Sequence, residues 1–248
     1  MIFPSFISRQ HIFLVNRKFI KAVKELKQQV FLYNQIHSTA NKENNENQVT
    51  YMWGSDSNLL NIVSEHFKLY ENFISESEEE NLMKEIDPIF KRRRYEFDHW
   101  DGAIQGYKET EKADWNEENS KIIQRLQKLA FPAECKTLKL VHVLDLSKDG
   151  YIKPHVDSVR FCGNIISGIS LLSSSIMRLA MEENKEMFVD VLLQRQSLYI
   201  MSGLVRYKFT HEILKDSESF FKGIAVPRGR RVSVICRNEP EEKIKTDV

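Results

Sequence analysis

Three side chains able to bind a metal ion form a short pattern in the second half of the sequence. His155 and Asp157 are separated by one residue, and His211 follows 54 residues after Asp157. Side chains alternate along a strand, so His155 and Asp157 would point to the same side of a sheet. Two imidazoles and one carboxylate on one face of a metal ion are the ligand set of non-haem Fe(II) sites with open positions. The pattern predicts an Fe(II) site, with hydrogen-bonded structural histidines as the alternative.

Two arginines further along the chain could complete such a site. Alternation places Arg231 and Arg237 on one face of an apolar stretch, together with Ser233 and Ile235. If the face with Val232, Val234 and Cys236 packs in the core, the arginines are solvated surface charges. If the face with the arginines is buried instead, the arginines need an anionic partner. A guanidinium can fork onto a carboxylate, so a dicarboxylate cosubstrate such as 2-oxoglutarate could supply that partner. Tyr199 could donate its hydroxyl to the same ligand or could be a core tyrosine.

The elements that must hold these residues are mostly short strands. From Leu138 onward, apolar or alternating runs are separated by Gly, Ser, Asn and Asp, which is typical of strands joined by turns. Around His211, alternation would place Tyr207 and Phe209 on the His211 face. Seven or eight strands that follow helices predict a mostly β fold with flanking helices, either a sandwich or a jelly roll. The predicted strands are 138–146, 151–156, 164–172, 176–181, 187–193, 197–201 and 231–237.

Two amphipathic helices are expected before the strands. Ser75 and Glu78 form a capping-box pattern, which predicts a helix over about 76–86 that ends near Pro88. A second helix begins near 114–116 and runs up to Pro132. Its apolar stripe consists of Ile122, Ile123, Leu126 and Leu129.

The distribution of charge argues against a protein that relies on non-specific phosphate contacts. The 248 residues include 36 Lys plus Arg and 35 Asp plus Glu, but residues 1–42 hold seven of the basic residues and one acid, Glu25. The other 29 basic and 34 acidic residues make the rest of the chain mildly acidic, whereas general nucleic-acid binders usually have the opposite sign. The length suits one catalytic domain with appendages.

The basic, acid-poor N-terminus is typical of a mitochondrial targeting segment. Its apolar residues stand at helical spacing, with a surface helix or a disordered tail as the alternative. Residues 39–56 are polar and indicate a linker. We expect 1–56 to be targeting segment and linker, 57–238 the folded domain and 239–248 a polar tail. The expected location is the mitochondrial matrix, and no run approaches the roughly 20 apolar residues of a membrane span.

Several other side chains have two interpretations. The basic run Lys91–Arg94 could contact phosphates or stay solvated at a helix end. His99, Trp100 and Tyr95 could line a substrate channel, or Trp100 could anchor the core. His142 is either a structural residue or a residue that orients a metal ligand without binding the metal itself. The three cysteines, Cys135, Cys162 and Cys236, are expected to be reduced, packed thiols.

Five stretches together resemble the AlkB family of Fe(II)- and 2-oxoglutarate-dependent dioxygenases, over roughly two thirds of the chain. They are RRRYEFDHWD, GYIKPHVDSVRFCG, SLYIMSG, FTHEIL and PRGRRVSVICR. The resemblance implies a double-stranded β-helix in which iron is bound by His155, Asp157 and His211. It also implies that 2-oxoglutarate is bound by Tyr199, Arg231 and Arg237.

The sequence departs from the nucleic-acid demethylases of that family at three places. Those relatives usually carry a further acid after the H-x-D motif, whereas Ser158 and Val159 stand here. Leu144 and Leu146 occupy positions where Asn and Tyr would hold the cosubstrate. A lid for a flipped base, which needs aromatic walls and polar readers, is not recognisable in residues 95–137.

We therefore expect hydroxylation of a protein side chain, with 2-oxoglutarate and dioxygen as cosubstrates. Resemblance to the mitochondrial branch of the family implies a role in programmed necrosis and fatty-acid metabolism. The alternatives are demethylation of mitochondrial RNA and a non-catalytic interaction protein in a cell-death pathway. The mildly acidic body and the missing second acid favour the first over the RNA substrate.

Overall fold

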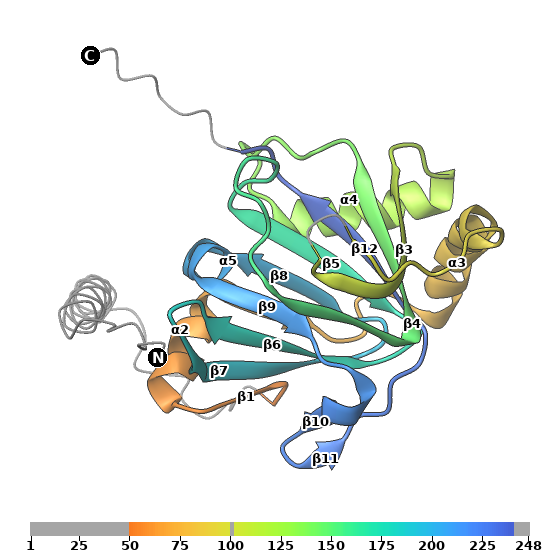
Figure 1. The fold of residues 1–248 in the computed structure, drawn as a ribbon. Helices are drawn as coiled ribbons and strands as arrows, with labels where there is room; N and C mark the ends of the chain where they lie inside the picture. Colours follow the sequence, from red (N-terminus) through yellow and green to blue (C-terminus); the bar gives the residue numbers. More distant parts are fainter. Residues whose placement is uncertain (1–49, 100–101, 241–248) are drawn as a thin grey trace, which may run out of the picture. The chain divides into compact units, whose positions relative to one another are not determined.

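The structure is a computed structural model that describes residues 50–99 and 102–240 (Figure 1). The helices of this part are α2 (Ser57–His66), α3 (Glu76–Phe90), α4 (Glu117–Ala130) and α5 (Gly203–Lys208), with a 3-10 turn at Asp216–Glu218. The strands are β1 (Met52–Gly54), β2 (Phe67–Tyr70), β3 (Ile104–Lys112), β4 (Val141–His155), β5 (Ile165–Leu171), β6 (Ser175–Met181), β7 (Asn184–Leu193), β8 (Leu198–Ser202), β9 (Phe209–Ile213), β10 (Phe220–Phe221), β11 (Ile224–Ala225) and β12 (Arg231–Arg237).

The strands form one curled antiparallel sheet and a separate β10–β11 hairpin. The sheet order is β1-β7-β6-β9-β4-β12-β5-β8-β2, with β3 also paired to β4. The sheet folds over on itself (Figure 1), because apolar side chains of β6 and β7 pack against those of β4, β5, β8 and β12 in one core. This arrangement confirms the predicted jelly roll with flanking helices.

The long strand β4 makes the fold possible because it serves both halves of the sheet. Its first part pairs with β12, from His142 to Leu146, and its last part pairs with β9 at Ile152 and His155. β3 runs along the opposite edge. The predicted strands 138–146 and 151–156 are therefore one continuous strand.

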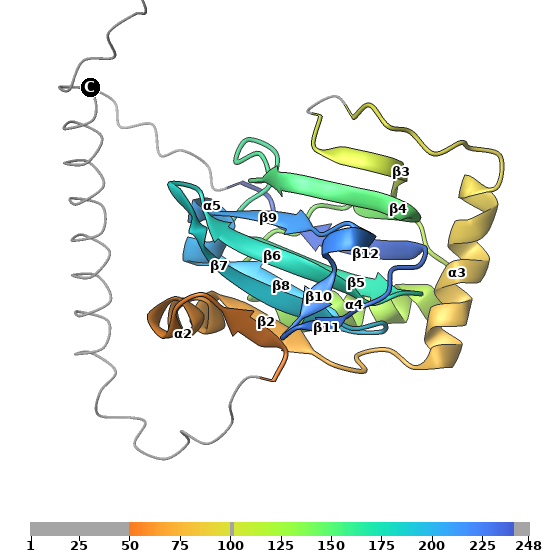
Figure 2. The ribbon, with the colours of Figure 1, turned by 60° about the horizontal axis from the view of Figure 1, so that its bottom comes forward.

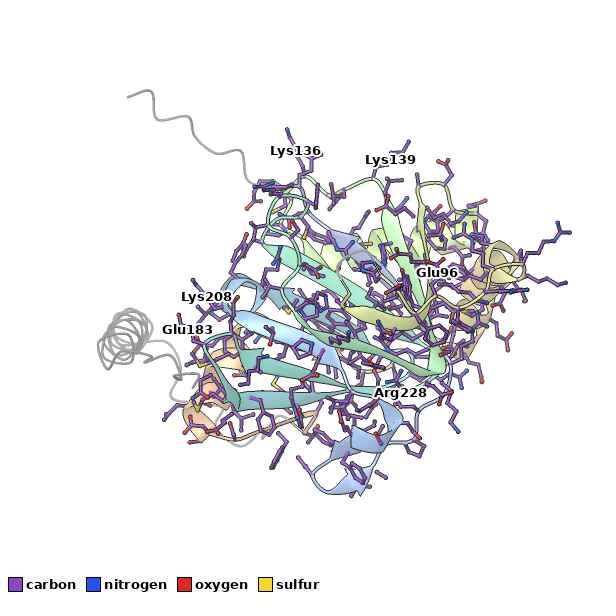
Figure 3. All side chains as sticks on the ribbon, viewed as in Figure 1. Glu96, Lys136, Lys139, Glu183, Lys208 and Arg228 are labelled. Carbon is purple, nitrogen blue, oxygen red and sulfur yellow. The ribbon has the colours of Figure 1, made fainter. Side chains whose placement is uncertain are left out.

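Glycines and a buried arginine support the bend in β4. A Cβ on Gly150 would lie 2.5 Å from the Gly106 carbonyl oxygen, and Gly106 has a φ of 64° at the bulge in β3. Arg228 is labelled in Figure 3. Its guanidinium donates one hydrogen bond to the carbonyl oxygen of Leu214, just after β9, and another to the carbonyl oxygen of Gly150. Arg228 thus ties the end of β9 to the bend.

The alternation along β12 separates two cores. Val232, Val234 and Cys236 belong to the core under α3 and α4, which cover the outer face of β4, β12, β5 and β8 (Figure 2). Ile235 belongs to the core inside the curled sheet, on the same face as the two arginines. The structure therefore selects the interpretation in which Arg231 and Arg237 point inward.

Both predicted helices are present; α4 has the predicted ends, whereas α3 is longer than predicted. α3 begins with the expected capping box, in which Ser75 and Glu78 exchange backbone and side-chain hydrogen bonds. It continues past Pro88 to Phe90, because a proline in the last turn removes one hydrogen bond whereas Phe90 is buried in the outer core. Leu129, at the end of the predicted α4 stripe, is exposed instead of buried.

Several elements have too weak a sequence pattern to be predicted. β3 reads IQGYKETEK and lacks an apolar run, and β1, β2 and β9 are three to five residues long. β1 pairs with β7, so the sheet begins at Met52 and includes part of the predicted linker. The predicted targeting segment lies outside the described residues. Among the helices of the described part, none is long and apolar enough to cross a membrane.

A buried carboxylate on α3 connects this helix to two turns of the sheet. Glu79 is 1% exposed and accepts hydrogen bonds from the Leu172 backbone N–H (2.7 Å), Arg195 Nε (2.7 Å) and Gln196 Nε2 (3.0 Å). Leu172 and Gln196 have positive φ angles, in the turns after β5 and β7. Burial alone raises the pKa of Glu79, but Arg195 and the other donors outweigh it and the pKa is lowered.

We expect Glu79→Ala to lower the free energy of unfolding by about 2–3 kcal/mol, because buried donors left without a partner cost about 1–3 kcal/mol each. Urea unfolding measures this effect. A lowered pKa contributes stability above the unfolded value near 4.5 that is lost as the pH falls. The decline in stability below about pH 4.5 should therefore be shallower in Glu79→Gln.

Glu80→Ala is the matched control, since the neighbouring Glu80 is exposed. Equal stability of the Glu79 and Glu80 variants would contradict the role given to Glu79.

Candidate active site

The three predicted metal ligands lie together at the end of β4. His155 is the last residue of β4 and pairs directly with His211 of β9, and their rings lie 4.2 Å apart between centroids. Asp157 Oδ1 is 3.2 Å from His155 Nε2 and 3.5 Å from His211 Nε2. One ligand atom from each residue lies within 4.8 Å of the others. Asp157 is outside the strand, so the loop after β4, and not strand alternation, brings its carboxylate beside the imidazoles.

The charge states of this group suit a divalent cation. Burial lowers the pKa of His211 to about 3, so its imidazole is neutral at pH 7 and can bind a metal. Burial alone raises the pKa of Asp157, but the hydrogen bond from His155 and nearby positive charges hold it well below its usual range. Neutral imidazoles and a carboxylate are the ligand types that bind Fe(II) in non-haem iron sites.

Arg231 is a buried cation at the far side of the same cavity. It is 2% exposed, and its Nε donates to the neutral hydroxyl of Ser170 at 3.0 Å. Burial lowers its pKa to about 10, so Arg231 stays charged at neutral pH. Among the described residues, no carboxylate forms an ion pair with it. A buried guanidinium without an anion is costly, and the carboxylate of a dianion such as 2-oxoglutarate would offset this cost.

Tyr199 lies in the cavity wall beside Arg231. It is 6% exposed, and burial raises its pKa to about 12, so its hydroxyl remains protonated and able to donate. Tyr199 pairs with Gly168 of β5, where a Cβ would lie 2.7 Å from the tyrosine ring. The glycine thus leaves the space that the ring needs.

Arg237 lies next to the metal ligands and not at the far end. Its Nε is 3.4 Å from Asp157 Oδ2, without the alignment of a hydrogen bond. The predicted contact of Arg237 with 2-oxoglutarate would therefore be close to the metal, while Arg231 would hold the distal carboxylate.

All six predicted site residues line one cavity of about 750 Å³. Leu144, at a position where demethylase relatives carry a polar residue, lines it as well. His99 and His142 lie in the wall, but Tyr95 points elsewhere and donates to Asp145 Oδ1 at 3.1 Å. Trp100 is outside the described residues. The run Lys91–Arg94 is exposed and does not line the cavity.

Arg206 is a further site residue, which the sequence pattern did not reveal. It is 1% exposed and donates to the carbonyl oxygens of Asp157 (2.9 Å), Gly163 (3.2 Å) and Cys162 (3.4 Å). It therefore holds the loop that carries Asp157. Arg206 lies on α5, so the prediction that Tyr207 continues the His211 strand is wrong: Tyr207 is helical and partly exposed. An arginine inside an otherwise apolar run was the available signal.

We expect Arg206→Gln to weaken Fe(II) binding by about 10–100-fold, because residues that orient a metal ligand have effects of that size. Competition with a colorimetric chelator under anaerobic conditions measures the affinity. Arg206→Lys keeps the positive charge but cannot donate to several carbonyl oxygens at once as the planar guanidinium does. Its affinity for Fe(II) should therefore be intermediate.

Lys208→Gln is the control, since Lys208 is an exposed cation on the same helix as Arg206 (Lys208 is labelled in Figure 3). Thermal unfolding of each variant separates loss of metal from loss of fold. Unchanged iron affinity in folded Arg206→Gln protein would contradict the positioning role.

Comparisons with known proteins agree with this geometry. Residues 10–237 match the model of the 2OG-Fe(II) oxygenase superfamily. The chain is 51% identical over 188 residues to the mouse protein named alpha-ketoglutarate-dependent dioxygenase alkB homolog 7, mitochondrial, covering 76% of this chain and 85% of the mouse protein. The cattle protein of the same name is 49% identical over 194 residues, covering 78% and 88%.

The fold is shared with more distant structures. A prolyl hydroxylase from Trichoplax adhaerens, in complex with a hypoxia inducible factor peptide fragment, superposes with a TM-score of 0.52 at 12% identity, covering 74% of this chain and 87% of that one. This likeness concerns the fold alone. The chain belongs to the 2OG-Fe(II) oxygenase superfamily, whose cofactor is Fe(II) and whose cosubstrate is 2-oxoglutarate, and within it to the AlkB family of dioxygenases.

Proposed function

We propose that His155, Asp157 and His211 bind Fe(II), and that Arg231, Tyr199 and Arg237 bind 2-oxoglutarate, in an enzyme that hydroxylates a protein side chain. With both bound, one atom of dioxygen enters a substrate C–H bond as hydroxyl and the other enters succinate, as 2-oxoglutarate loses carbon dioxide. The observation that carries this proposal is the shared cavity, which joins a triad able to hold a metal ion to a buried cation that has no anionic partner among the described residues.

The side chains of the chain would divide the work as follows. Arg231 would bind the distal carboxylate, with Ser170 keeping the guanidinium oriented. Arg237 would balance the charge of Asp157. Arg206 would keep Asp157 in position through the loop carbonyls. Apolar side chains also line the cavity, among them Leu144, Ile152, Ile166, Met177, Ile213 and Ile235.

The preference for a protein substrate is supported by charge and by the loop after β4. The part of the chain outside residues 1–42 is mildly acidic, which is unfavourable to a phosphate backbone. Ser158 and Val159 follow Asp157 where demethylase relatives usually have a further acid that helps to read a base. Demethylation of an RNA base is then the competing outcome for the substrate experiment below.

The proposed location is the mitochondrial matrix. The mouse and cattle relatives are named as mitochondrial, and residues 1–42 have the basic, acid-poor composition of a targeting segment. The proposed cellular role, programmed necrosis with a link to fatty-acid metabolism, rests on the family resemblance. A cell that keeps this role with Asp157→Ala protein would indicate a non-catalytic function instead.

Anaerobic addition of Fe(II) and 2-oxoglutarate should produce a metal-to-ligand charge-transfer band. We expect His155→Ala to abolish it. We expect Arg231→Ala to raise the 2-oxoglutarate concentration needed by about 10–100-fold, since hydrogen bonds to a charged group contribute about 1.5–3 kcal/mol. Lys139→Ala removes an exposed cation and is the control (Figure 3). Absence of the band in folded wild-type protein would contradict the proposed cofactor site.

The substrate class can be tested with isotopic oxygen. We expect matrix extract incubated with enzyme, 2-oxoglutarate and ¹⁸O₂ to yield peptides heavier by one ¹⁸O atom, as read by mass spectrometry. Asp157→Ala enzyme should give none. Release of formaldehyde from mitochondrial RNA, without labelled peptides, would replace the protein substrate by a methylated base.

A further inference from the structure

An acidic group lies in the cavity wall on β3, a strand that carries neither the predicted metal ligands nor the arginines. Glu109 of β3 places one carboxylate oxygen 3.5 Å from His99 Nε2 and the other 3.5 Å from His142 Nε2. All three residues line the cavity. Glu109 pairs with Leu144, and Glu111 pairs with His142. The paired residues share a face, so Glu109 and His142 face the same interior as Leu144.

The charge of Glu109 is poorly compensated within the described residues. Its ion-pair partners there are the two histidines, and burial lowers the pKa of His142 to about 3, so that imidazole is neutral. Arg237 is already in contact with Asp157. Burial, together with the charge of Glu96, raises the pKa of Glu109 and outweighs the opposing effects of His99 and Arg237. A half-buried carboxylate in this environment favours a cation that can displace water from it.

Further acidic side chains surround this wall. Glu111 is exposed and lines the cavity. Glu96, labelled in Figure 3, forms a bridge with Tyr107 of β3, and the Tyr107 hydroxyl donates to its carboxylate at 3.5 Å. The β3 side of the cavity is therefore acidic, in contrast to the arginines on β12. Carboxylates on β3 and the Arg231 guanidinium on β12 would attract a cationic substrate and an anionic cosubstrate to different walls of the cavity.

We propose that Glu109 is the substrate-binding residue of this cavity, and that it binds the ammonium or guanidinium group of a lysine-type or arginine-type side chain. This inference rests on the proposed function and specifies its substrate. The cation would contact Glu109, with the His142 and His99 rings packed beside the carboxylate. The aliphatic carbons of the same side chain would then lie in the apolar part of the cavity, between Glu109 and the metal ligands.

The binding of side-chain analogues tests this proposal without a known substrate. Protein loaded with Zn(II), which is redox-inert, and with 2-oxoglutarate is titrated with n-butylammonium, n-propylguanidinium and uncharged n-butanol. Saturation-transfer NMR measures each dissociation constant. We expect at least one cation to bind about tenfold more tightly than n-butanol, and Glu109→Gln to remove that difference. Tighter binding of n-butylammonium would indicate a lysine-type substrate side chain, and tighter binding of n-propylguanidinium an arginine-type one.

Matched variants separate a specific contact from general electrostatics. Glu183→Gln removes an exposed acid at the β6–β7 turn and should leave cation binding unchanged (Figure 3). Glu111→Gln should weaken it less than Glu109→Gln does. Glu109→Asp keeps the charge on a shorter side chain and should bind with intermediate affinity, which also guards against a folding defect in the glutamine variant.

Two failures are distinguishable. If calorimetry shows that 2-oxoglutarate itself does not bind the Zn(II) protein, the proposed function fails. If 2-oxoglutarate binds but the cations bind no better than n-butanol, or Glu111→Gln matches Glu109→Gln, the role of Glu109 is overturned.

Discussion

His155 and His211 pair directly across β4 and β9, and this pairing requires one edge of β4 to serve two different strands. The first part of that edge is occupied by β12, so β9 can reach the end of β4 only where the strand has bent away. Gly150 and Gly106 allow the close approach at the bend, and Arg228 holds the end of β9 against it. The proposed metal ligands, the arginines of β12 and the acidic wall of β3 line one cavity because β4 pairs with β9, β12 and β3 and leads directly into the loop with Asp157.

Buried charge explains how the site differs from the rest of the interior. Arg206 satisfies its donors with loop carbonyls, so it is a structural cation that needs no ligand. Glu79, on the outer side of the sheet, is satisfied by donors from two turns. Arg231 differs from both, because it is equally buried and has a neutral hydroxyl as its partner. A protein tolerates such a charge where a ligand of opposite sign completes the site.

The cavity is lined by charges of both signs. Arg231 of β12 has no anionic partner among the described residues, whereas Glu109 and Glu111 face the cavity from β3. Apolar side chains such as Leu144 and Met177 line the same cavity. Under the proposed function, an anionic cosubstrate and a cationic substrate would be selected by charges of opposite sign on different strands.

The sequence alone was enough to predict the metal-ligand types, the alternation along β12 and most strands, because these follow from local spacing and apolar periodicity. His155, Asp157, His211, Arg231 and Tyr199 could be selected in this way. The sequence could not show that both faces of β12 are buried and that the face with the arginines lines the cavity, since local alternation does not reveal what packs on either face. Arg206 and Glu109 were not predicted as site residues for a related reason. Arg206 lies on the short helix α5, and Glu109 lies on the polar strand β3. Their roles arise from contacts across 49 residues to Asp157 and across 33 residues to His142, and only the tertiary structure makes such contacts.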